Sequence, residues 1–308
     1  MTDTINENQK GIWQAVDLIC DTPVLLILQS LWLGINRFDA LHEATGLTKT
    51  VMSDRLKKLS NAEIISRRAY NTRPLRYEYI FQERGFKLFE TALMMYRWEN
   101  TWNPDGVSES FKLQHHTCGE YIMPLCACIS CKDEVNPQDI DVTLNIDIAN
   151  YPETYVKRRR QSGSAALKKE KPIIFQEIAE IFGDRWSTLI VRAAFFGVKR
   201  YDGFLKATNA STNILADRLS WLSEKGILKK QEYQVNPPRF EYVLRRKGLE
   251  ILPILLFMLD WVDTVFAPND PKTVTLRHTK CGSPLKVAPK CSHCGEILSF
   301  DELRLKTS

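Results

Sequence analysis

Apolar residues in the second half of this chain recur at the intervals that helices require. From 178 to 196 they are spaced by three and four positions, and Gly183 with Asp184 interrupts the pattern, which predicts two helices. Ser211 is a suitable N-cap for a later helix over 212–222, whose apolar residues form one face. The other face of that helix is polar, so it is available for binding.

Two segments after this helix are predicted to form a β-hairpin. Residues 227–232 and 239–244 favour strands and flank a Pro-Pro turn, and a strongly apolar helix is expected over 248–266. This order of elements is that of a winged helix-turn-helix: helices, then a capped helix with a free polar face, a hairpin and a closing helix. In that fold the capped helix enters the major groove of DNA, so we expect 212–222 to be a groove helix.

The first half of the chain follows the same order. Thr48 is the expected cap, 49–59 the groove helix, 66–80 the wing and 86–102 the closing helix. A gap-free shift of 163 residues places the two halves in register, and so long a period indicates two tandem domains rather than a solenoid. Residues identical under this shift include Asp21 and Asp184, Arg55 and Arg218, Trp98 and Trp261, and Cys118 and Cys281.

The composition limits the possible partners, cellular location and function class of the protein. The chain has 308 residues and a net charge of +5, which permits nucleic-acid binding without requiring it. Eight cysteines without a secretion signal indicate a reducing, cytoplasmic location, and the longest apolar cluster, 251–259, is too short to span a membrane. No glycine-rich phosphate loop or nucleophile with its base is recognisable, so we do not expect an enzyme.

Positive charge is concentrated in the first half. An excess of four positive charges lies in 66–76 and of three in 48–59, against two in 229–239 and none in 211–222. Because phosphate contacts supply most non-specific affinity, we expect the first half to hold the DNA backbone and the second to read bases or shape. The candidate DNA-binding residues are Thr48, Lys49, Thr50, Ser53, Arg55, Lys57, Arg67, Arg68, Arg73, Arg76, Ser211, Thr212, Asn213, Arg218, Lys229, Lys230 and Arg239.

The adjacent pairs Asp54 with Arg55 and Asp217 with Arg218 have another interpretation. An acidic and a basic residue repeated side by side in both halves can orient a helix against its neighbour instead of contacting DNA. Basic runs are also often only a solvated face of the protein.

Two identical ligand patterns follow the winged segments. They are His115-x2-Cys118-x9-Cys128-x2-Cys131 and His278-x2-Cys281-x9-Cys291-x2-Cys294. Two close pairs of soft ligands separated by a hairpin-length segment suit a tetrahedral zinc ribbon, so we expect two structural zinc ions per chain, each held by the four residues of one pattern. His116, Cys126, His293 or a water molecule are alternatives for the histidine ligand, and a metal-free thiol cluster that switches by oxidation is another.

The fold expected from these patterns is mainly α-helical with small β-hairpin wings. It comprises two winged helix-turn-helix domains, each followed by a zinc-ribbon-like module. Val142, Leu144, Ile146 and Ile148 alternate with polar residues, so this segment is expected to add a strand to the first module. The expected ranges are 10–105 and 173–268 for the winged domains, 111–150 and 273–303 for the ribbon modules, and 151–172 for a basic linker, which either follows a DNA backbone or is a solvated tether.

Several segments resemble the HxlR-type winged-helix transcription regulators. The resemblance is close in DRWSTLIVRAAFFGVKRYDGF, LADRLSWLSEKGIL and NPPRFEYVLRRKGLEILPIL, and looser in TPVLLILQSLWLGINRFDAL, MSDRLKKLSNAEI and RPLRYEYIFQERG. It implies proteins that bind operator DNA as homodimers and pair through their first and last helices. The pairing contact would then include Trp261 with Ile254, Leu255 and Met258, and Trp98 with Leu93 and Met94.

Two features depart from this family. The first half has Thr22 and Pro23 where the second half has Arg185 and Trp186, so the start of its second helix is altered. Several members sense oxidants through a cysteine near the first helix, but Cys20 lies at the junction of the first two helices. A sensing role is therefore not carried over, and Cys20 is expected to be a small buried hydrophobe.

Together these patterns predict a sequence-specific DNA-binding transcription regulator. One chain would act as a covalently fused pseudo-dimer, pairing its two repeats intramolecularly on double-stranded operator DNA, with further homodimerisation left open. The alternatives are a zinc-containing protein-interaction module of the transcription machinery and a thiol-based redox-sensing regulator.

Overall fold

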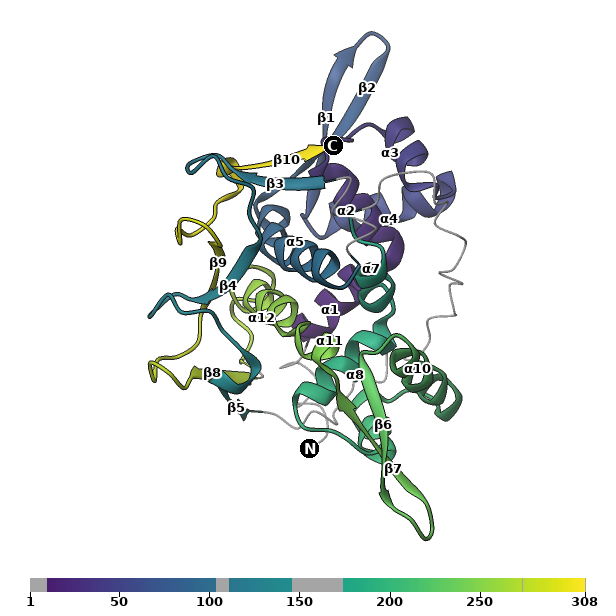
Figure 1. Ribbon diagram of the computed structural model, residues 1–308. Coiled ribbons are helices and arrows are strands. Elements are labelled where there is room, and N and C mark those ends of the chain that lie inside the picture. Colours follow the sequence, from purple (N-terminus) through teal and green to yellow (C-terminus); the bar gives the residue numbers. More distant parts are fainter. Residues whose placement is uncertain (1–9, 104–110, 146–173, 273, 308) are drawn as a thin grey trace.

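The first half of the protein has the predicted order of helices and hairpin (Figure 1). The computed structural model describes residues 10–103, 111–145, 174–272 and 274–307, so the predicted linker 151–172 and Ile146 and Ile148 lie outside the described residues. The elements are α1 (Lys10–Ile19), α2 (Thr22–Trp32), α3 (Phe38–Thr45), α4 (Lys49–Asn61), β1 (Ile65–Thr72), β2 (Leu75–Phe81), α5 (Glu83–Trp102), β3 (Phe111–His115), β4 (Pro124–Cys128), the short helix η2 (Pro137–Asp139) and β5 (Ile140–Leu144).

The second half repeats this order with one difference. The predicted helix over 248–266 is divided into three helices. Pro253 lacks a backbone N–H and fits only at the start of a helix, so it accounts for the break between the first two, and the third is a π-helix that continues directly from the second. The elements are α7 (Glu177–Phe182), α8 (Arg185–Phe195), α9 (Tyr201–Thr208), α10 (Thr212–Glu224), β6 (Leu228–Gln234), β7 (Arg239–Leu244), α11 (Arg246–Leu249), α12 (Leu252–Trp261), the π-helix η4 (Val262–Phe266), β8 (Val274–His278), β9 (Val287–Cys291), η5 (Phe300–Glu302) and β10 (Leu303–Thr307).

The mainly helical fold with small antiparallel sheets is confirmed. Strands β1 and β2 form the first wing and β6 and β7 the second, each an antiparallel pair. The two wings extend from opposite ends of the molecule (Figure 1). No helix within the described ranges is long and apolar enough to cross a membrane.

The two halves pack against each other through reciprocal contacts. Helix α5 packs on α12, and the indole N–H of Trp98 donates to the carbonyl of Lys247 at 3.0 Å. The indole N–H of Trp261 donates to the carbonyl of Arg84 at 2.9 Å, which is the same contact with the halves exchanged. Both indoles are almost fully buried, so these helices share one core.

A second contact between the halves lies where α2 and α8 begin. Asp21 and Asp184, equivalent under the 163-residue shift, face each other in an isolated antiparallel bridge. A Cβ on Gly183 would lie 2.1 Å from Oγ1 of Thr22 in the other half. Only glycine allows the two helix starts to approach this closely.

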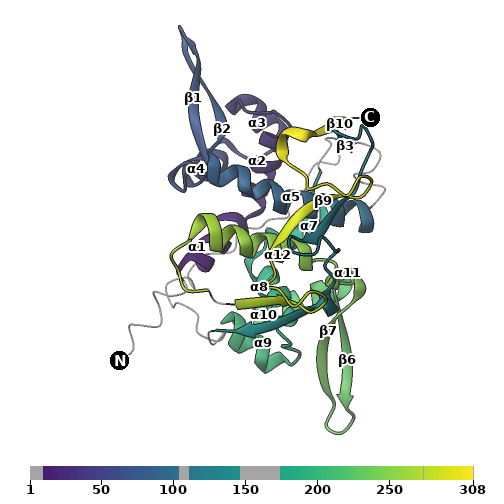
Figure 2. The same ribbon diagram turned by 90° about the vertical axis from the view of Figure 1, so that its left-hand side faces the viewer.

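Strands after the winged segments pair between the halves. Strand β3 pairs with β10, β5 with β8, and β4 with β9, all antiparallel. Cys126 lies opposite Pro289 in the β4–β9 pair, and these two positions are themselves equivalent under the shift. Figure 2 shows the three strand pairs one above another on the face that looks left in Figure 1.

Two predictions are therefore wrong. Among the described strands, neither half builds a ribbon module of its own, and the segment containing Val142 and Leu144 is a strand that pairs with β8 of the second half rather than with the first module. An antiparallel ladder needs only a partner strand of suitable register. The strand expected to pair locally with β3 is β5, and its equivalent in the other half, β10, provides the same register.

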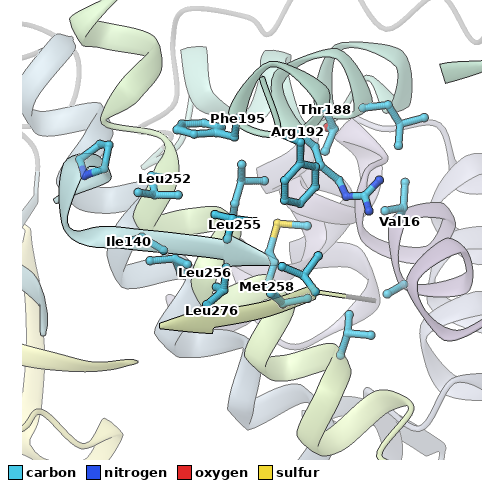
Figure 3. A pocket seen from close by; sticks show the side chains of 18 residues that line it. Val16, Ile140, Thr188, Arg192, Phe195, Leu252, Leu255, Leu256, Met258 and Leu276 are labelled. Atoms are coloured by element: carbon cyan, nitrogen blue, oxygen red, sulfur yellow. The ribbon is translucent and has the colours of Figure 1, made fainter. Parts of the chain in front are cut away.

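An apolar cavity of about 140 Å³ lies beside α12 (Figure 3). Helices α1 and α8 and strands β5 and β8 complete its wall.

Candidate DNA-binding surface and metal clusters

Each groove helix begins at the predicted cap. The hydroxyl of Thr48 accepts a hydrogen bond from the N–H of Val51, and the hydroxyl of Ser211 accepts one from the N–H of Ile214, both at 3.4 Å. This bond satisfies an amide that the first helical turn leaves without a partner. The inner faces of the two helices are buried, through Met52, Leu56 and Leu59 in α4 and Leu215, Leu219 and Leu222 in α10.

Most of the predicted DNA-binding residues are exposed. Helices α4 and α10 both lie on the right of Figure 1, on the side opposite the cross-paired strands. The exposed candidates are Thr48, Lys49, Thr50, Ser53, Lys57, Arg67, Arg68, Arg73, Arg76, Ser211, Thr212, Asn213, Lys229, Lys230 and Arg239.

Arg55 and Arg218 instead turn inward. Arg55 is 5% exposed, and its Nε donates to the Asp21 carboxylate at 2.8 Å. Arg218 is half-buried and repeats the contact with Asp184 at 2.7 Å. Each aspartate is also the N-cap of α2 or α8, so it connects that helix to the groove helix. These contacts support the helix-orienting interpretation over direct DNA contact.

The wings carry aromatic and basic side chains that sequence reasoning did not select. The Arg37 guanidinium lies 4.3 Å from the Tyr70 ring centre, and Arg200 lies 4.9 Å from Tyr233 in the other half. Both tyrosines are exposed, and the arginines join the second strand of each wing through isolated bridges. Both the arginine and the tyrosine recur under the 163-residue shift, and this repetition could have identified the pair from the sequence.

The metal-ligand candidates form two clusters, and each cluster takes residues from both halves. His115, Cys118, Cys291 and Cys294 make the first, and Cys128, Cys131, His278 and Cys281 the second. The prediction that each local pattern supplies one complete site is wrong. The β4–β9 pairing brings the first ligand pair of one half beside the second pair of the other half.

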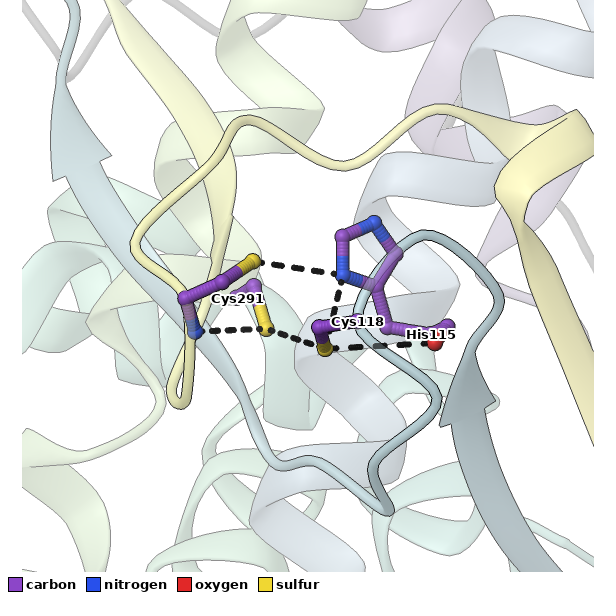
Figure 4. Close-up of side chains that lie close together, drawn as sticks. His115, Cys118 and Cys291 are labelled. Atoms are coloured by element: carbon purple, nitrogen blue, oxygen red, sulfur yellow. Dashed lines mark hydrogen bonds between the residues drawn. The ribbon is translucent and has the colours of Figure 1, made fainter.

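Distances inside the first cluster suit a tetrahedral ion. Nδ1 of His115 lies 3.3 Å from Sγ of Cys118 and 3.4 Å from Sγ of Cys294, and the sulfurs of Cys118 and Cys291 are 4.0 Å apart (Figure 4). A zinc ion with ordinary bond lengths would separate N from S by about 3.6 Å and S from S by about 3.8 Å.

The second cluster repeats these distances. Nδ1 of His278 lies 3.3 Å from Sγ of Cys131 and 3.4 Å from Sγ of Cys281, and the sulfurs of Cys128 and Cys281 are 4.0 Å apart. Both histidines are fully buried. Three sulfurs around one imidazole nitrogen in each cluster therefore form a donor set that fits zinc.

Backbone amides favour the thiolate form that a metal requires. A backbone N–H from Ser283, followed by the His278 ring, lowers the pKa of Cys281 to about 6. Burial opposes ionisation at Cys291, yet amides from His293 and Cys294, each 3.4 Å from its sulfur, lower its pKa overall. Metal binding to Cys281 therefore releases few protons near neutral pH.

The competing ligands do not join either cluster. Among the described residues, His116, Cys126 and His293 lie outside both groups of four. Cys126 is fully buried, and burial raises its pKa to about 12. Cys20 is likewise a buried core residue, as expected, and burial raises its pKa to about 12.

Comparison with known proteins agrees with the paired winged elements. A family model described as the HxlR-like helix-turn-helix matches residues 18–106 and 181–270, which together make up more than half of the chain. The chain belongs to this family. Both matched regions contain a capped groove helix and a wing.

Relatives of this HxlR-like chain are regulators of transcription rather than enzymes. An uncharacterized HTH-type transcriptional regulator of Mycobacterium tuberculosis (strain ATCC 25618 / H37Rv) is 30% identical over 131 residues, which cover 42% of this chain and 83% of that protein. Another from Synechocystis sp. (strain PCC 6803) is 36% identical over 93 residues, covering 29% and 69%. Among solved structures, PA1607, a suggested transcription factor, is 31% identical over 42% of this chain and 92% of its own, with a TM-score of 0.38.

Proposed function

We propose that this HxlR-like chain is a sequence-specific DNA-binding transcription regulator that acts as a covalently fused pseudo-dimer. The reciprocal bonds of Trp98 in α5 to Lys247 in α11 and of Trp261 in α12 to Arg84 in α5 carry this proposal. They join two winged halves that each expose a capped helix, so a single chain offers two groove helices in a fixed relation. In DNA-binding dimers such a pair reads two half-sites about one helical turn apart.

The two groove helices differ, so the proposed operator has two unlike half-sites. The first half exposes Lys49, Lys57 and Arg67 and holds the DNA backbone. The second half exposes Thr212 and Asn213 at the start of α10, where polar side chains reach base edges. A fused chain is free to use different half-sites because its two halves mutate independently.

Each cluster would hold one structural zinc ion. Four protein ligands close the tetrahedral coordination shell, so the ion contributes folding energy rather than catalysis. Because His115 and Cys118 share a cluster with Cys291 and Cys294, each ion would also link the two halves. Two ions would then fix the spacing of the winged domains on the face opposite the groove helices.

Selection of bound sequences from a random DNA pool by the full-length chain tests this function. The expected result is a bipartite, non-palindromic motif. Lys49→Ala should weaken the contribution of one half-site, and Asn213→Ala should relax base preference at the other. A palindromic motif would contradict the two unlike half-sites, and no enrichment would favour a protein-interaction module.

A further inference from the structure

Each cluster histidine has a second ring nitrogen that no hydrogen bond satisfies. Nδ1 of His115 and of His278 faces sulfurs, and Figure 4 shows the other ring nitrogen of His115 directed away from them. In both histidines this atom, Nε2, is buried and has no hydrogen-bond partner within the part of the chain that the structure describes. A histidine that binds metal through one nitrogen normally donates its other N–H to a carboxylate, a carbonyl or water, which fixes the ring and its tautomer. Each cluster thus needs an acceptor at Nε2.

An acidic residue from the other half lies beside each histidine. Glu302 and Asp139 are equivalent under the 163-residue shift, and each immediately precedes the strand residue that lies opposite the histidine, His115 or His278. Each backbone carbonyl accepts a hydrogen bond from the amide that follows the histidine, at 2.7 and 2.9 Å. Each carboxylate also caps its own short helix, η5 or η2. The two acids therefore occupy the same place and share one structural role.

The two carboxylates differ in their reach toward the histidine. Oε2 of Glu302 lies 4.0 Å from Nε2 of His115, and the Glu302 side chain is 42% exposed. A hydrogen bond of about 2.9 Å requires an approach of about 1 Å, which a glutamate with freedom toward solvent can make. Asp139 is one methylene shorter and 10% exposed, and its Oδ2 lies 3.0 Å from the Lys280 ammonium. Within the described ranges, no carboxylate comes as close to Nε2 of His278.

We propose that Glu302 is the positioning residue of His115. With zinc bound, Glu302 accepts the Nε2–H, holds the ring with Nδ1 toward the sulfurs and makes that nitrogen a stronger ligand. His278 lacks this support, so the two clusters differ in how their histidine is held. The inference rests on the zinc sites of the proposed function, and it adds to them a residue outside both groups of four ligands.

Competition between the full-length, zinc-loaded chain and a chromophoric chelator measures both zinc affinities without DNA. Glu302→Asp keeps the charge and a side chain that caps the equivalent helix in the other half, but it shortens the reach. Glu302→Gln keeps the length and removes the charge. Each variant should lower the affinity for one of the two ions by about 10- to 100-fold. Asp139→Asn is the matched control, because it alters the equivalent cap, and it should leave both affinities nearly unchanged.

A second readout separates positioning from capping. In nitrogen–proton correlation spectra of the histidine rings of the zinc-loaded chain, the Nε2–H proton of His115 should resonate downfield of that of His278. The reason is that a hydrogen bond to a carboxylate is short and strong. Both Glu302 variants should move this proton upfield. A residue that only caps η5 would leave the proton unshifted, and that result would contradict the proposal.

Unchanged zinc affinities in both Glu302 variants would overturn the positioning role and leave the two zinc sites intact. Equal losses in Glu302→Asp and Asp139→Asn would do the same, because the shared capping role would then explain both. A parent chain that binds no zinc would refute the proposed sites themselves together with this inference.

Discussion

His115 and Cys294 lie 3.4 Å apart, measured from imidazole Nδ1 to Sγ, although they belong to different halves of the chain. Cys131 and His278 repeat this relationship at 3.3 Å. Each candidate metal ion would therefore bind both repeats at once. Metal binding would thus link the two winged domains to each other.

Paired cysteine variants distinguish shared clusters from local ones. Cys118→Ser with Cys291→Ser removes two ligands from one cluster, so zinc content should fall from two ions per chain to one. Cys118→Ser with Cys128→Ser removes one ligand from each cluster and should lower the retention of both ions. Elemental analysis after dialysis against a weak chelator measures the content. The opposite pattern would show that each half holds its own ion.

The ion pairs of the two groove helices should differ in strength. Arg55 and Asp21 have side chains 6% and 10% exposed, whereas Arg218 and Asp184 are 24% and 27% exposed. Arg55→Ala should therefore lower the free energy of unfolding by about 3 kcal/mol, since it leaves a buried carboxylate unpaired. Arg218→Ala should cost only about 1 kcal/mol. Urea unfolding of the zinc-loaded chain compares them, and equal losses would refute the difference.

Arg67 should contribute to DNA affinity without regard to sequence. It is exposed on the first wing, 5.2 Å from the Tyr77 ring, whereas its neighbour Arg68 already pairs with Glu78 at 2.7 Å. Arg67→Ala should weaken all DNA sequences alike and reduce the slope of log K against log salt by about 0.9. Adding Arg68→Ala should reduce the slope further, but by less than about 0.9, because Arg68 is already paired with Glu78.

The control for this measurement is Lys306→Ala. Lys306 is exposed on β10, which belongs to neither the wings nor the groove helices, so the slope should not change. An unchanged slope in Arg67→Ala would show that Arg67 does not contact a phosphate.

Cys20 should resist alkylation in the folded chain. Burial raises its pKa to about 12 from an ordinary value of 9.0, so almost no thiolate forms at pH 8. Because the folded pKa is the higher one, the stability from the neutral thiol is fully present below pH 9 and is lost as the pH rises toward 12. Iodoacetamide labelling at pH 8 should spare Cys20 until urea is added. Rapid labelling of folded protein would contradict this burial.

The winged elements were predictable because their signals are local. Caps at Thr48 and Ser211, apolar faces and turn residues each act within a few positions along the chain. The inward direction of Arg55 was also visible, since it occupies the buried stripe of Met52, Leu56 and Leu59. Its positive charge made a DNA contact equally reasonable before the partner Asp21 was seen.

The arrangement of the clusters was not predictable from spacing. Both halves carry the same ligand types at the same intervals, so a pattern shows which residues can bind metal but not which pairs meet. That choice depends on β4 pairing with β9, a contact between strands far apart in sequence. The cavity was hidden for the same reason, because its wall combines α1, α8, α12 and two cross-paired strands.

Native mass spectrometry of the chain bound to its selected operator tests the fused pseudo-dimer most directly. The account predicts one chain, two zinc ions and one duplex carrying both half-sites. A complex of two chains per duplex, or one chain that binds equally well after either half-site is scrambled, would contradict it.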